Sequence, residues 1–72
     1  MNMKKQLLEA IKDDMVYDYV ANNYWRLSKE ELAYIAKELA FAVHVALSKG
    51  NAQDVWDEMQ ENVENDIKEE DE

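Results

Sequence analysis

The chain has 72 residues, a formal net charge of −9, one glycine, no proline and no cysteine. This length allows one domain at most, and the lack of cysteine excludes disulfides and thiolate metal sites. A chain of this size is marginal for a self-sufficient core, so helix packing or association with another subunit has to supply its stability.

Apolar residues recur at helical spacing, and alternating β-branched runs with turn dipeptides between them are missing from the sequence. We therefore predict an all-α fold with an antiparallel three-helix arrangement, dimerising through the central helix. The helices are expected over about 3–21, 28–49 and 52–68. Residues 1–68 would form a single helical domain, and 69–72 an acidic, disordered tail.

The first predicted helix, 3–21, has an apolar face that spans about 120° on a helical wheel. We place its end near Asn22 and Asn23, because asparagine favours turns. Charged residues interrupt its apolar residues, so a secretory signal is not expected. No stretch approaches the roughly 20 apolar residues of a membrane span, and we expect a cytoplasmic protein. The face consists of Leu7, Leu8, Ile11, Met15 and Tyr19.

The second predicted helix, 28–49, has clear boundaries and two apolar faces. Ser28 and Glu31 fit a capping box at its start, and Gly50 fits the left-handed position after its end. The main face consists of Leu32, Ile35, Ala36, Leu39, Val43, Ala46 and Leu47. The second face consists of Tyr34, Phe41 and Val45, about 150–180° away.

The second face has two interpretations. The first helix, or the aromatic turn around Tyr24 and Trp25, could cover it within one chain. Alternatively, it meets a second copy of the chain or another protein. We favour the second interpretation, because a small chain without disulfides gains from extra burial.

The third predicted helix, 52–68, has an N-cap candidate in Asn51 and negative charge in its first turn at Asp54. Its apolar stripe is about 120° wide and includes Ala52, Val55, Trp56, Met59, Val63 and Ile67. Combining the three helices, we predict a core of Leu8, Ile11, Met15, Leu32, Ile35, Leu39, Val43, Leu47, Val55, Trp56, Met59 and Val63.

The net charge lies in the last 22 residues, where one lysine stands against ten acidic residues. Five of these acids share the helix face opposite Trp56: Asp54, Asp57, Glu58, Glu61 and Glu64. Such a face either keeps the protein soluble or docks on a basic surface with salt-sensitive kinetics. The second possibility would make the chain similar in action to acidic, DNA-mimic-like regulators, by analogy alone.

Catalytic, cofactor-binding and metal-binding residues are not predicted. His44 has no carboxylate four residues away on its own face, and Ser28 is explained by its capping role. Asp13, Asp14 and Asp18 do not have the glycine turn and spacing of a calcium loop. The basic residues are too few for direct nucleic-acid binding, and no membrane binding is expected.

We therefore predict a small, acidic, non-enzymatic protein–protein interaction module, with inhibition or regulation of its partner as one possible role. The partner would be a second copy of the chain or a protein with a basic surface. The expected partner-binding residues are Tyr34, Phe41, Val45, Asp54, Asp57, Glu58, Glu61 and Glu64. The alternative is a purely structural, self-associating helical module whose acids serve solubility.

Overall fold

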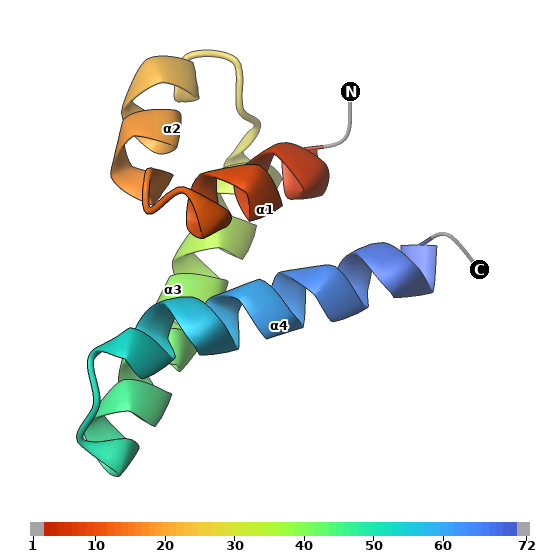
Figure 1. The fold of residues 1–72 in the computed structure, drawn as a ribbon. Helices are drawn as coiled ribbons and strands as arrows, with labels where there is room; N and C mark the ends of the chain where they lie inside the picture. The colour runs from red at the N-terminus through yellow and green to blue at the C-terminus, as the bar shows by residue number, and fades with distance from the viewer. Residues whose placement is uncertain (1–2, 71–72) are drawn as a thin grey trace.

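A computed structural model describes residues 3–70, and these residues are all-α, with four helices (Figure 1). The helices are α1 (Met3–Lys12), α2 (Val16–Asn23), α3 (Lys29–Lys49) and α4 (Gln53–Glu70). α4 packs against both α1 and α3, and α2 packs against α1. Figure 1 shows α1 and α4 running in opposite directions, with both crossing α3. α4 therefore joins α1 to α3.

The first predicted helix, 3–21, is divided into α1 and α2, so the three-helix expectation is replaced by four helices. α1 ends in a Schellman motif, in which the Met15 N–H donates to the Ala10 carbonyl (2.7 Å) and the Asp14 N–H to the Ile11 carbonyl (3.1 Å). Asp14 takes the left-handed position with φ 55°. Aspartate tolerates this conformation better than most residues, because its short polar side chain can bond locally.

Both ends of α3 are as predicted. The Glu31 N–H donates to Ser28 Oγ (3.1 Å), and the Ser28 N–H donates to Glu31 Oε1 (2.8 Å), which completes the capping box. At the other end Gly50 has φ 72°, and its N–H donates to the Ala46 carbonyl (2.7 Å).

α4 begins where Asn51 caps it, since Asn51 Oδ1 accepts from the Gln53 N–H (3.0 Å). It continues to Glu70, two residues beyond the expected end at 68. Lys4 of α1 pairs with the Glu70 carboxylate (2.5 Å), which offsets negative charge at the end of this helix. Of the expected tail 69–72, Glu69 and Glu70 are helical, while Asp71 and Glu72 lie outside the described residues.

The core is centred between α1 and α4. Its largest fully buried side chains are Leu7, Ile11, Met59 and Val63. α3 contributes four buried residues to the side that faces α4: Ile35, Glu38, Ala42 and Ala46. These four lie within about 80° of one another on a helical wheel.

The predicted core is only partly correct. Ile11, Ile35, Met59 and Val63 are buried, whereas Leu8, Leu32, Leu39, Val55 and Trp56 are half-buried. Met15, Val43 and Leu47 are exposed, with exposed fractions of 49%, 41% and 78%. Met15 follows the end of α1, and α3 is turned about 80° from the expected orientation. That rotation directs the small side chains of Ala42 and Ala46 toward α4 and the larger Val43 and Leu47 toward solvent.

Replacing Ser28 by alanine should lower the free energy of unfolding by about 1 kcal/mol, because the Glu31 N–H loses its cap acceptor. Urea denaturation followed by circular dichroism measures the change. Ser48→Ala is the matched control, since Ser48 is exposed in the last turn of the same helix and its hydroxyl donates to the His44 carbonyl. An equal loss in both variants would contradict the capping role.

Candidate functional site

The most distinctive surface feature is an apolar face of α3 that no other helix fully covers. Leu32 and Leu39 are half-buried, while Ala36, Val43 and Leu47 are exposed. These five residues, which we call the α3 strip, lie within about 80° of one another on a helical wheel. The strip belongs to the main face that the sequence analysis assigned to the core. Of the seven residues of that face, three are therefore exposed, two are half-buried and two are buried.

None of the five residues of the α3 strip is charged, and the charged residues in this stretch of α3 lie on other sides of the helix. Lys37 and Glu38 are the two charged residues within this stretch of α3. Both point more than about 100° away from the centre of the strip on a helical wheel. A long apolar strip without interrupting charge is typical of a protein-interaction surface rather than of ordinary solvent-facing helix.

Apolar hollows adjoin both ends of the α3 strip. The first is a groove between α2 and α3 with a volume of about 330 Å³. Its lining consists of Val16, Tyr17 and Val20 from α2, Leu32, Ile35, Ala36 and Leu39 from α3, and Trp56 from α4. Tyr17 stands at this groove with an exposed fraction of 84%. The second hollow, about 360 Å³, lies beside Val43, Leu47 and Val55.

The predicted second face of α3 does not form one exposed patch. Tyr34 and Val45 are half-buried, and Phe41 alone of the three is exposed, at 48%. The aromatic turn does not cover this face, because Tyr24 and Trp25 are themselves largely exposed. On α3, the apolar surface available to a partner is therefore the α3 strip, together with the isolated ring of Phe41.

The Tyr34 side chain instead links three helices. Its hydroxyl donates to Asp66 Oδ2 of α4 (2.5 Å), and the Lys4 ammonium of α1 lies 4.9 Å from the centre of its ring. Lys4 also pairs with Glu70, and this hydrogen bond raises the pKa of Lys4. Burial, followed by the hydrogen bond to Asp66, raises the pKa of the Tyr34 hydroxyl. These contacts therefore hold α1, α3 and α4 together, which indicates a structural role for Tyr34.

Five of the eight acids of α4 lie opposite the buried Met59 and Val63 on a helical wheel, two of them exposed and three half-buried. We call Asp54, Asp57, Glu58, Glu61 and Glu64 the acidic ridge. Gln53 donates to Asp57 (3.4 Å) and Gln60 donates to Glu64 (2.9 Å), both through side-chain amides. Within residues 3–70, no lysine or arginine pairs with an acid of the ridge. The ridge therefore offers unneutralised negative charge.

Within residues 3–70, no group of three or more histidine, cysteine or acidic side chains could hold a metal ion. The Ser48 hydroxyl donates to the His44 backbone carbonyl (3.1 Å) rather than to its imidazole. None of the helices in this part of the chain is long and apolar enough to cross a membrane.

Comparison of the chain with protein-family models, curated proteins and solved structures finds no match. The candidate site therefore depends on geometry alone. All five strip residues were predicted to lie on one face of the second helix, but that face was expected to be part of the core. The alanines at 42 and 46 were the signal for the true orientation, because small residues favour close helix contacts.

Removing the Tyr34 hydroxyl should change how stability depends on alkaline pH. The unfolded tyrosine ionises near pH 10, while the folded hydroxyl keeps its proton to higher pH. The contribution of the hydroxyl to the free energy of unfolding is therefore complete below about pH 10, and it is lost as the pH rises toward the folded pKa. Tyr34→Phe should lower stability by about 1 kcal/mol at pH 7. Its free energy of unfolding should then fall less steeply above about pH 10 than that of the wild type.

Urea denaturation at a series of pH values tests this expectation. Tyr24→Phe is the control, because Tyr24 is an exposed tyrosine away from the cluster. It should follow the wild type across the series. If the free energy of unfolding of Tyr34→Phe and of the wild type changed in parallel with pH, this would contradict the assigned hydrogen bond from Tyr34 to Asp66.

Proposed function

We propose that this chain is a non-enzymatic protein–protein interaction module, and that its α3 strip pairs with a second copy of the chain. One observation carries the proposal. Leu47 projects from one end of the strip with an exposed fraction of 78%, and an apolar groove about 330 Å³ in volume adjoins the other end. A protruding leucine and an apolar groove on one face make that face complementary to itself.

Helix geometry fits a two-fold antiparallel pairing. Eleven residues separate Ala36 from Leu47 in the sequence, which corresponds to about 16 Å along the helix. If the symmetry axis passes midway between them, Leu47 of each copy lies opposite Ala36 of the other. Each leucine then meets the groove beside Ala36, and the exposed Ala36 and Ala40 allow the helices to approach closely. Such an interface is isologous and closes without forming a filament.

The net charge of the chain and the area of its surface also support a second copy as the partner at the α3 strip. A chain with a net charge of −9 repels its own copies, so self-association needs an uncharged contact surface. The α3 strip is uncharged, and the acidic ridge lies on α4. A stable interface takes about 800 Å² from each partner, roughly a sixth of the 5024 Å² surface of this chain. One face of a molecule measuring 34 × 31 × 21 Å can supply that area.

The acidic ridge supports a second activity of the same module, which is binding to a protein with a basic surface. The observation in favour is that its five acids, of which Asp57 and Glu61 are exposed, have no lysine or arginine partner in the described residues. A dimer formed through α3 would present two such ridges. Attraction to a basic surface would then speed association and make it sensitive to salt. Regulation or inhibition of the partner would follow from occupying its basic site.

The dimer is tested by light scattering on a size-exclusion column. The wild type should have twice the mass of one chain, and Leu47→Asp should be monomeric and folded, because a buried charge cannot be accommodated in the interface. Ser48→Asp is the matched control: it adds the same charge one residue away, outside the strip, and should remain dimeric. A monomeric wild type, or equal dissociation of both variants, would contradict the pairing.

The acidic ridge is tested by charge reversal. Replacing Asp57, Glu58, Glu61 and Glu64 by lysine should abolish salt-sensitive complexes in pull-downs from a cell extract while the helical circular dichroism persists. The control reverses four exposed acids elsewhere, Glu9, Asp13, Asp18 and Glu30, and should retain the complexes. Recovery of the same proteins with and without the ridge reversals would show that the ridge is not a binding surface.

A further inference from the structure

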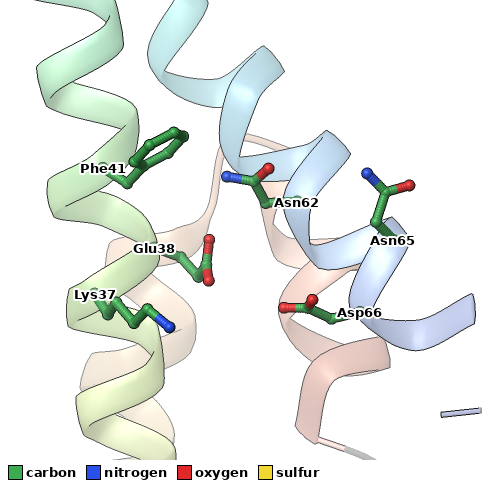
Figure 2. A pocket seen from close by; sticks show the side chains of 6 residues that line it. All are labelled: Lys37, Glu38, Phe41, Asn62, Asn65 and Asp66. Atoms are coloured by element: carbon green, nitrogen blue, oxygen red, sulfur yellow. The ribbon is translucent and has the colours of Figure 1, made fainter. Parts of the chain in front are cut away.

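Glu38 is a buried carboxylate with an unusual environment. Its exposed fraction is 7%, and it is the only charged residue among the buried residues of the described chain. Within residues 3–70 it has no hydrogen-bond or ion-pair partner. Figure 2 shows its carboxylate pointing from α3 toward α4, into a hollow of about 360 Å³. Since no fully buried side-chain oxygen of the described residues lacks a hydrogen-bond partner, the Glu38 carboxylate oxygens are open to the hollow and can accept from a bound group.

The other walls of the hollow complete a site for a cation. Asp66 points into it from α4, opposite Glu38 (Figure 2). The Tyr34 hydroxyl occupies one Asp66 oxygen, Oδ2, which leaves the other as an acceptor. The amides of Asn62 and Asn65 lie along the α4 side, and the half-exposed ring of Phe41 forms an aromatic wall.

The shape and chemistry of the hollow select the kind of cation. Ca²⁺ needs six to eight oxygen ligands at about 2.3–2.6 Å, whereas this hollow is wide and has an aromatic wall. A guanidinium group is planar, bonds to two carboxylate oxygens at once and stacks on aromatic rings. A guanidinium group can therefore bond to Glu38 and Asp66 while its plane stacks on the Phe41 ring. A lysine ammonium is not planar, so it cannot stack in this way or form two parallel hydrogen bonds to one carboxylate.

We propose that the hollow between α3 and α4 binds the guanidinium group of an arginine side chain on a basic partner protein. Glu38 and Asp66 accept its hydrogen bonds, and the Phe41 ring stacks on it. This inference rests on the proposed binding of a basic partner and names the side chain that is recognised.

Among residues 3–70, neither Arg26 nor Lys37 pairs with Glu38 or Asp66, and Lys4, which interacts electrostatically with Asp66, pairs with Glu70. Arg26, its one arginine, donates to Gln6 Oε1 (3.4 Å), away from the residues that line the hollow. Lys37 lines the hollow but pairs with neither carboxylate in the described structure. The site is therefore available to a cation supplied from outside.

The test titrates isotope-labelled protein with N-acetyl-arginine amide and follows the side-chain amide signals of Asn62 and Asn65 and the ring signals of Phe41 by NMR. These signals should shift in a saturable way with the arginine probe. N-acetyl-citrulline amide, which has the same shape without the charge, should leave them unchanged. Glu38→Gln should weaken binding at least tenfold. Glu9→Gln removes the same charge from an exposed position outside both the hollow and the acidic ridge and should change it less than twofold.

Phe41→Leu provides an independent variant that retains the acids and should weaken binding several-fold. Equal shifts with citrulline, equal affinities of Glu38→Gln and Glu9→Gln, or an unchanged affinity in Phe41→Leu would each overturn the site. If MgCl₂ shifted the same signals at a lower concentration than the arginine probe, the hollow would be assigned to a divalent cation instead. Repeating the titration in Leu47→Asp separates failure of this site from failure of the proposed dimer, and the ridge reversals test the basic partner separately.

Discussion

The close packing of α4 against the alanine side of α3 decides how the rest of the chain is arranged. Ala42 is fully buried and Ala46 nearly so, and small side chains allow two helix axes to approach closely. α4 also contacts α1, so Met59 and Val63 complete one core with Leu7 and Ile11. Once α3 directs its alanines toward α4, its larger Val43 and Leu47 have to face outward. Glu38 lies on the same inward side and becomes a buried carboxylate.

This arrangement gives the molecule surfaces of different chemistry. The α3 strip is uncharged and apolar, while the acidic ridge on α4 holds carboxylates without basic partners in the described residues. A chain this small has little core of its own, so covering the strip in the proposed dimer would add stability to the described helices. Because the acids lie on another helix, two copies would meet at the strip with little repulsion. Self-association and attraction of a basic partner are thus compatible in one molecule.

Much of the fold could be predicted from local signals, and the misses have specific physical causes. The all-α class and the caps at Ser28, Gly50 and Asn51 are confirmed, because capping depends on residues close together in the sequence. The break at Asp14 was missed, since aspartate marks a left-handed position less clearly than glycine. The orientation of α3 was missed because periodicity identifies an apolar face, but not which of two faces another helix will cover. The hollow beside Glu38 was missed for a related reason: it depends on residues from both α3 and α4.

The central claim is that the α3 strip meets the strip of a second copy. The most direct test mixes chains with ¹³C-labelled methyl groups and unlabelled chains, and records NOEs filtered for contacts between the two populations. The proposed pairing predicts cross-peaks from the Leu47 methyl groups to protons of Ala36 and Leu39 in the other copy. A spectrum without intermolecular cross-peaks at concentrations where the chain is dimeric by light scattering, or with cross-peaks confined to other surfaces, would contradict it.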